Sequence, residues 1–230
     1  MPLITVLRQN VSGRAAAQHE RLIRFVAQRA REDGNTFNWS TRISTGSEGR
    51  VVGFVSGVDG FAALAGREDA DAMIRRLYGE GDGNAILESL GEAVTSTSYT
   101  VLSPREDLSG QVVQLDNPPP LLMVTRLRPT PSGGLGCEEL IRKVIEAAAK
   151  VDEDRRYNVL TPAVGELGTY TVVQGVTDPA QLDSQAQLPE LLAEAYGAAE
   201  GQKIFAEGTA CIQEAQSELS VLREDLSNLS

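Results

Sequence analysis

Apolar residues recur at helical spacing in two stretches of the chain that lie 118 residues apart. They are Leu22, Ile23, Val26 and Ala30 in the first stretch, and Leu140, Ile141, Val144 and Ala148 in the second. Side chains three and four residues apart share one face of an α-helix. The pattern predicts a helix over residues 15–32, stopped at Gly34, and a second helix at the matching place.

Short runs rich in apolar and β-branched residues predict strands on either side of these helices. The predicted strands cover residues 3–8, 37–43, 51–55 and 94–103, and then 121–127, 157–161, 169–173 and 212–222. Helical spacing returns at 70–78, 85–93 and 188–196. In residues 37–43 the pattern alternates, with Phe37, Trp39 and Ile43 on one face and Asn38, Ser40 and Arg42 on the other.

An internal repeat explains why each element occurs twice. Residues 105–109 read Arg-Glu-Asp-Leu-Ser, and residues 223–227 repeat these five letters at an offset of 118. The same offset matches Tyr78-Gly79 with Tyr196-Gly197, whereas the aromatic-Asn pair at residue 37 recurs at residue 157, two residues further on. A series in register indicates a duplication. Three prolines at 118–120 favour a boundary near residue 116, so we expect domains over 1–115 and 116–230.

Within each half the elements follow the order β-α-β-β-α-β, which is typical of the ferredoxin-like fold. An antiparallel sheet with helices on one face needs a cover on the other. We therefore predict an α+β protein in which two such repeats form one pseudo-dimeric barrel. This arrangement resembles the dimeric α/β-barrel superfamily, which includes the antibiotic-biosynthesis monooxygenases and the NIPSNAP-type proteins.

Composition narrows the classes of partner. The 230 residues carry a net charge of −11, which argues against nucleic-acid binding. The acidic residues are concentrated in residues 116–230, which contain 18 acidic and 9 basic residues. No apolar run is long enough for a membrane span, and no signal peptide is recognisable at the start. Two cysteines cannot build a disulfide framework, so we expect a cytoplasmic protein.

His19 is the only histidine, and Cys137 stands at its matching position. A histidine can act as a general base near neutral pH, and it can equally be a plain polar residue on a helix, which is the interpretation we favour. One histidine and two distant cysteines do not form a metal site, and the sequence predicts no cofactor.

The resemblance to the antibiotic-biosynthesis monooxygenases implies a cofactor-free oxygenase pocket with Asn, Trp, Tyr or His side chains. The residue types are present here as Asn38, Trp39 and Tyr99. Alternatively, Trp39 is a core aromatic residue and Asn38 a polar residue of the sheet surface. If Asn38, Ser40 and Arg42 face an open cavity between the two sheets, they are candidates for ligand binding.

Two further motifs have structural interpretations. The stretch Gly79-Glu80-Gly81-Asp82-Gly83 lacks the Lys-Ser/Thr of a phosphate loop and predicts a helix end followed by a turn. The repeated Arg-Glu-Asp-Leu-Ser is expected to fasten the ends of the last strands across the pseudo-dimer, with a partner-binding tail as the alternative.

Three functions stay open. The first is binding of a small, partly apolar molecule between the two sheets. The second is a cofactor-independent oxygenase that uses Asn38, Trp39, His19 or Tyr99. The third is a non-catalytic structural or regulatory module whose acidic half binds a protein partner. Whether the chain forms a homo-oligomer also stays open.

Overall fold

The computed structural model describes residues 2–46, 49–109, 117–152 and 155–229. The chain divides into two compact units. The first contains Met1–Val101, Leu115–Pro118 and Ser220–Ser230, and the second contains Leu102–Gln114 and Pro119–Leu219. The predicted boundary between residues 115 and 116 falls outside the described residues. Each unit thus holds a segment from the far end of the other half of the sequence.

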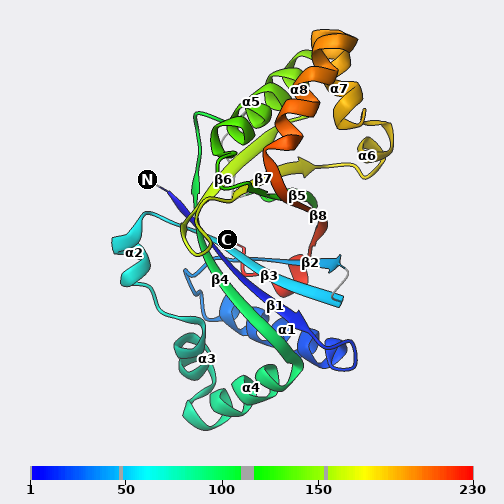
Figure 1. The fold of residues 1–230 in the computed structure, drawn as a ribbon. Helices are drawn as coiled ribbons and strands as arrows, with labels where there is room; N and C mark the ends of the chain where they lie inside the picture. Colours follow the sequence, from blue (N-terminus) through cyan, green and yellow to red (C-terminus); the bar gives the residue numbers. More distant parts are fainter. Residues whose placement is uncertain (1, 47–48, 110–116, 153–154, 230) are drawn as a thin grey trace. The chain divides into compact units, whose positions relative to one another are not determined.

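The first unit is built from three strands, four helices and parts of two further strands. Its strands are β1 (Leu3–Val11), β2 (Ser40–Gly46) and β3 (Gly49–Val58), and its helices are α1 (Ala16–Glu32), α2 (Phe61–Ala65), α3 (Ala70–Tyr78) and α4 (Glu80–Ala93). The unit also holds most of β4 (Val94–Pro104) and the end of β8 (Ile212–Leu222). In Figure 1, α1 lies alongside these strands, with α3 and α4 beyond it.

The second unit repeats this order of elements. Its strands are β5 (Leu121–Pro129), β6 (Tyr157–Val164) and β7 (Tyr170–Val176), and its helices are α5 (Gly134–Val151), α6 (Ala180–Ser184), α7 (Leu188–Tyr196) and α8 (Ala198–Ala210). The 3-10 helix η1 (Glu224–Leu226) follows β8 and belongs to the first unit. The short helices α2 and α6 were not predicted, because five residues are too few to show a helical period.

The described strands pair in the order β1-β3-β2-β8-β5-β7-β6-β4, which closes into an eight-stranded barrel. The pairing registers of the two units differ by 118 residues throughout. In the first unit Thr5 pairs with Ser56, and the matching pair in the second unit is Met123 with Gln174. Likewise, Ser40 pairs with Val55 in the first unit, and Asn158 pairs with Val173 in the second. The two-residue displacement of the aromatic-Asn pair is therefore not a shift of the strand register, which places Tyr157 at the position of Trp39.

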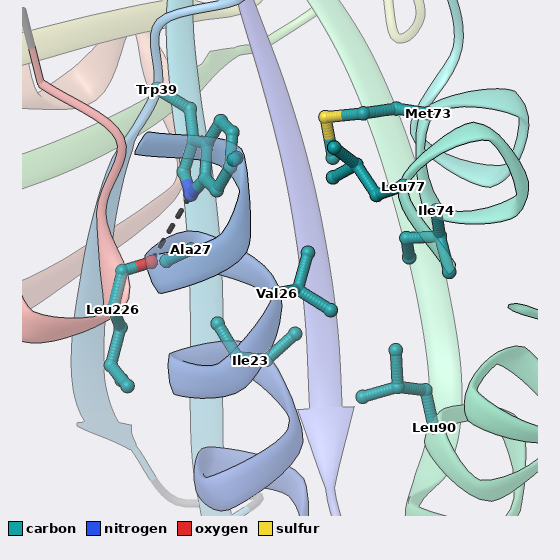
Figure 2. Packing of buried hydrophobic residues seen from close by; sticks show 10 residues of the cluster. Ile23, Val26, Ala27, Trp39, Met73, Ile74, Leu77, Leu90 and Leu226 are labelled. Carbon is teal, nitrogen blue, oxygen red and sulfur yellow. Dashed lines mark hydrogen bonds between the residues drawn. The ribbon is translucent and has the colours of Figure 1, made fainter. Parts of the chain in front are cut away.

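Trp39 marks the start of β2 and not its middle. The predicted strand over residues 37–43 begins only at Ser40, and Trp39 forms an isolated bridge with Asn228. Its side chain lies in the main apolar cluster of the first unit with Ile23, Met73 and Leu90, as Figure 2 shows. Phe37 and Ile43 pack against the same cluster, so the predicted apolar face of this stretch is correct.

Glycines fix the corner between the second and third long helices of each unit. Gly79 has a φ of 82° and separates α3 from α4, and Gly197 has a φ of 86° between α7 and α8. Residues 80–83, predicted as a turn, form the first turn of α4 instead. Gly83 sits there because a Cβ would lie 2.8 Å from the Cα of Arg75, which only glycine avoids.

None of the helices in the described ranges combines the length and apolar character that a membrane crossing needs.

Candidate functional site

A cavity of about 840 Å³ lies inside the first unit, between its strands and its helices. Its wall comes from β1, β3 and β4 on one side and from α1, α3 and α4 on the other. The volume is within the range of small-molecule sites. The cavity is therefore not in the space between two sheets, where the sequence predicted a ligand.

Buried apolar side chains form one part of the cavity wall, and exposed residues such as Tyr99 and Gly91 form another. Trp39, Met73 and Leu90 line it and are each less than a tenth exposed. Ile23 and Val26 of α1 contribute to the same wall. The apolar face that predicted this helix is therefore also part of the cavity lining. A wall of this kind favours the apolar body of a ligand.

Arg67 provides the cation of the cavity lining. It follows α2 in the chain, and its Nη2 donates a hydrogen bond to Ser56 Oγ over 2.8 Å. Nη1 reaches Thr5 Oγ1 over 3.5 Å, and the guanidinium lies 3.5 Å from the ring centroid of Phe37. Burial lowers the pKa of Arg67, while the neighbouring Tyr99 opposes that shift. The group remains charged at neutral pH.

The acids next to Arg67 in the sequence have other partners. Glu68 accepts hydrogen bonds from Arg76, which also pairs with Asp33 over 2.7 Å. Asp69 caps α3 by accepting a hydrogen bond from the backbone N–H of Ala72 over 2.7 Å. In the described residues, Arg67 therefore makes no ion pair with a carboxylate.

Trp39 is held in the cavity wall by residues 223–228. Its indole Nε1 donates to the carbonyl of Leu226 over 3.1 Å, as Figure 2 shows, and to Thr41 Oγ1 over the same distance. The backbones of Trp39 and Asn228 exchange hydrogen bonds of 2.9 and 3.0 Å. This segment therefore sets the position of the largest aromatic group in the lining.

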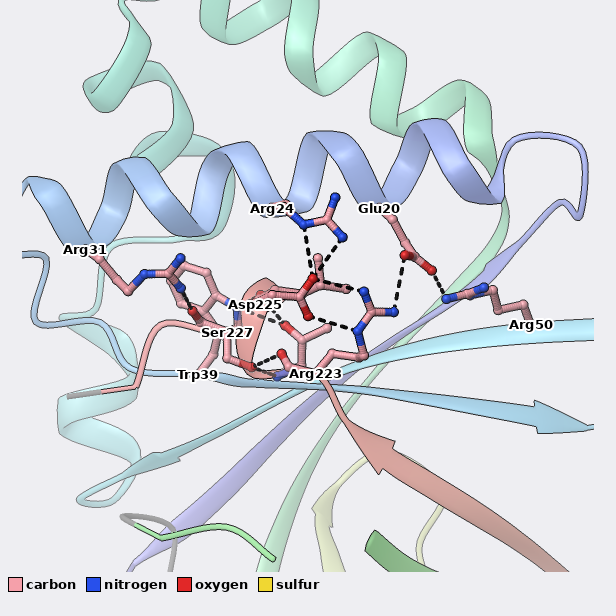
Figure 3. A network of polar contacts seen from close by, with 10 residues as sticks. Glu20, Arg24, Arg31, Trp39, Arg50, Arg223, Asp225 and Ser227 are labelled. Atoms are coloured by element: carbon pink, nitrogen blue, oxygen red, sulfur yellow. Dashed lines mark hydrogen bonds and ion pairs between the residues drawn. The ribbon is translucent and has the colours of Figure 1, made fainter. Parts of the chain in front are cut away.

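The 223–228 segment is itself fastened to α1 and β2 (Figure 3). Arg223 pairs with Glu20 over 3.2 Å, and Asp225 accepts from Arg24 over 2.8 Å. The guanidinium groups of Arg223 and Arg24 lower the pKa of Asp225 to about 2. In the second unit Arg105 pairs in the same way with Glu138 over 2.8 Å. These contacts support the structural role predicted for the repeated motif.

His19 lies behind the cavity and does not line it. It is 1% exposed, and its Nε2 is 3.0 Å from the amide oxygen of Gln9, a lining residue. Burial, and then the charge of Arg50, lower its pKa to about 4, so the ring is neutral at pH 7. Because the amide oxygen of Gln9 can only accept, the proton is on Nε2.

The structure places two of the predicted site residues in the cavity wall and the others outside it. Trp39 and Tyr99 line the same cavity. Asn38 is exposed, whereas Ser40 and Arg42 are buried, and none of these three lines it. Burial lowers the pKa of Arg42 to about 10. Arg67 was missed because a single arginine after a glycine has no signal in the sequence.

The described part of the chain contains no group of three or more His, Cys, Asp and Glu side chains placed to hold a metal ion. The polar groups of the cavity lining are hydroxyls, the amide of Gln9, the guanidinium of Arg67 and the carboxylates of Glu68, Asp69 and Asp71. Its chemistry is therefore that of hydrogen bonding and charge recognition.

No family model matches the sequence, and no curated protein matches it. Solved structures do. A candidate monooxygenase from Fusobacterium nucleatum subsp. nucleatum ATCC 25586 has a TM-score of 0.59 at 9% identity, over 96% of this chain and 92% of that one. A candidate monooxygenase from Lactobacillus acidophilus NCFM has a TM-score of 0.56 at 7% identity, over 96% and 93%.

An anthrone oxidase-like protein has a TM-score of 0.54 at 14% identity and covers 100% of this chain and 94% of its own. Similarity at these identities shows a shared fold. The chain has the α+β fold of the dimeric α/β-barrel proteins, as the sequence predicted.

Proposed function

We propose that the first unit binds a small, largely apolar molecule in its cavity. The observation that carries this proposal is a volume of about 840 Å³ whose wall combines buried apolar side chains with polar and charged groups. Sites for small organic molecules combine these two features. Trp39 lies in the wall and is the only tryptophan of the chain, so its emission reports on occupancy.

The test uses N-phenyl-1-naphthylamine, a neutral apolar dye whose fluorescence rises when it leaves water. We expect saturable binding to the wild-type chain, with energy transfer from Trp39 to the dye. Gly91 lines the cavity, and a Cβ there meets no atom within 4 Å, so Gly91→Leu starts a larger side chain from an open point of the wall. This variant should bind the dye at least about tenfold more weakly, because the added side chain occupies its place.

Gly81→Leu is the matched control. It lies on the same helix, its Cβ also meets no atom within 4 Å, and it does not line the cavity. We expect wild-type affinity for this variant. No saturable binding to the wild-type chain, or equal binding to both variants, would contradict the proposed site.

A cofactor-independent oxygenase is the second candidate. It is favoured by the presence of Trp39, Tyr99 and Arg67 in one cavity and by a fold shared with candidate monooxygenases. Such an enzyme converts a CH₂ group flanked by phenol rings into C=O, consuming one O₂ and releasing one H₂O. Oxygen uptake with a hydroxylated anthrone tests it: quinone should form one-to-one with O₂ and slow down in Tyr99→Phe.

We further propose that the chain arose by duplication, with repeats over 1–115 and 116–230. The identical offset of the strand registers, of the glycines at 79 and 197 and of the ion pairs at 105 and 223 supports it. Ligand binding by Asn38, Ser40 or Arg42, and a protein partner for the acidic half, stay predictions.

A further inference from the structure

Arg67 lies at the meeting point of two neighbouring strands. Thr5 on β1 and Ser56 on β3 are partners in the strand register, and their hydroxyl oxygens are 2.8 Å apart. Ser56 Oγ accepts the shorter hydrogen bond from the guanidinium, and the ring of Phe37 lies against its face. In the part of the chain that the structure describes, the guanidinium donates to two hydroxyls, and its other three N–H donors make no hydrogen bond there.

The second unit shows that this corner folds without a charge. At the matching positions 118 residues later, Ser56 becomes Gln174, Arg67 becomes Gln185 and Thr5 becomes Met123. The two glutamines still meet, since Gln174 Nε2 donates to Gln185 Oε1 over 3.0 Å. The contact between the two positions is thus kept in both units, and only the first makes it with a cation. Fold stability alone does not account for the charge.

Placing a guanidinium in a partly buried wall opposes its solvation, which the lowered pKa of Arg67 reflects. In the described residues no ion pair with a carboxylate offsets this cost: Glu68 and Asp69 are engaged with Arg76 and with the start of α3, and Asp71, which also lines the cavity, makes no ion pair with Arg67. An anionic group of a ligand would offset it. Arginine is suited to this role because its planar fork matches an oxyanion in two hydrogen bonds.

We propose that Arg67 binds the oxyanion of an amphiphilic ligand, a carboxylate or phenolate attached to an apolar ring system. This rests on the proposed function, since the apolar part occupies the cavity beside Trp39, Met73 and Leu90. Tyr99, which also lines the cavity, is near enough to Arg67 to raise its pKa. The second unit, with neutral glutamines at this corner, does not share the preference.

The experiment compares two dyes of one skeleton. N-phenyl-1-naphthylamine is neutral, and 1-anilinonaphthalene-8-sulfonate adds one fixed negative charge to the same rings. We expect the wild-type chain to bind the sulfonate at least about tenfold more tightly, the range of a charge-assisted hydrogen bond. Arg67→Gln, which installs the residue of the second unit, should remove this preference and leave binding of the neutral dye within about twofold.

Arg21→Gln is the matched control, because Arg21 is exposed on α1 and its loss changes the net charge by the same amount. It should keep the preference. Arg67→Lys should keep part of it, since the charge stays while the planar fork is lost. Added salt offers a test without any variant: it should weaken sulfonate binding to the wild type and leave the neutral dye unchanged.

The outcomes separate the two proposals. If neither dye binds, the proposed function is wrong. If the neutral dye binds and the sulfonate binds no better, or if Arg67→Gln and Arg21→Gln behave alike, the cavity is a binding site but Arg67 does not recognise an anion. If Arg67→Gln fails to fold, the salt dependence and Arg67→Lys decide.

Discussion

Removing one hydroxyl at Ser227 should destabilise the first unit and alter the surroundings of Trp39. Ser227 Oγ accepts a hydrogen bond from the backbone N–H of Thr41 over 2.8 Å and donates to the carbonyl of Arg223 over 2.7 Å. Both Ser227 and Thr41 are at most 1% exposed. In Ser227→Ala the buried N–H of Thr41 loses its acceptor, which costs about 1–3 kcal/mol.

The effect should reach Trp39 because the next residue towards the N-terminus, Leu226, accepts from its indole N–H. Urea unfolding followed by circular dichroism measures the loss of stability. The emission maximum of the native state measures the surroundings of Trp39, and it should move to longer wavelength as the indole gains contact with water.

Ser109→Ala provides the matched comparison in the second unit. Ser109 Oγ accepts from the backbone N–H of Val159 over 3.0 Å and donates to the carbonyl of Arg105 over 2.8 Å. We expect a similar loss of stability without any change in the native emission of Trp39. The reasoning is refuted if Ser227→Ala stays within about 0.5 kcal/mol of the wild type, or if both variants move the emission equally.

Two further changes have expected outcomes. The pKa of His19 is about 4 in the folded chain against 6.5 unfolded, so the unfolded state binds the proton more tightly. Stability should be complete above pH 6.5 and fall by up to about 3 kcal/mol towards pH 4. Denaturation curves across this range should show the loss, and His19→Cys, which copies position 137, should remove the part between pH 6.5 and 5; an unchanged slope would contradict it. Gly83→Ala should cost about 1–3 kcal/mol, because its Cβ would lie 2.8 Å from the Cα of Arg75, whereas Gly81→Ala should not destabilise. Thermal unfolding distinguishes the two, and equal melting temperatures would contradict the packing argument.

The order of the main elements and the fold class could be predicted because they depend on patterns that repeat along the chain. The apolar spacing of Ile23 and Val26 gave α1, and alternation placed Phe37 and Trp39 on the core side. The internal offset of 118 then predicted a second set of the same elements, and the structure has one.

The cavity could not be predicted because it depends on contacts between residues far apart in sequence. Nothing near Trp39 indicates that Leu226, 187 residues later, accepts its indole N–H. Likewise, the position of Arg67 in the cavity wall depends on its hydrogen bonds to Thr5 and Ser56, which the strand register places side by side. His19 looked like an ordinary helical polar residue, and its burial became visible only once β1 placed Gln9 against it.

The allocation of residues 220–230 to the first unit has a consequence for synthesis. These residues provide the partner of Arg42 in β2 and the contacts of Trp39, yet they are translated after the whole of β5 to α8. While the ribosome makes the second unit, the first has an open strand edge at β2 and lacks the Leu226 carbonyl that accepts the indole N–H of Trp39. Until residues 220–230 are synthesised, the incomplete first unit is therefore exposed to aggregation through this strand edge.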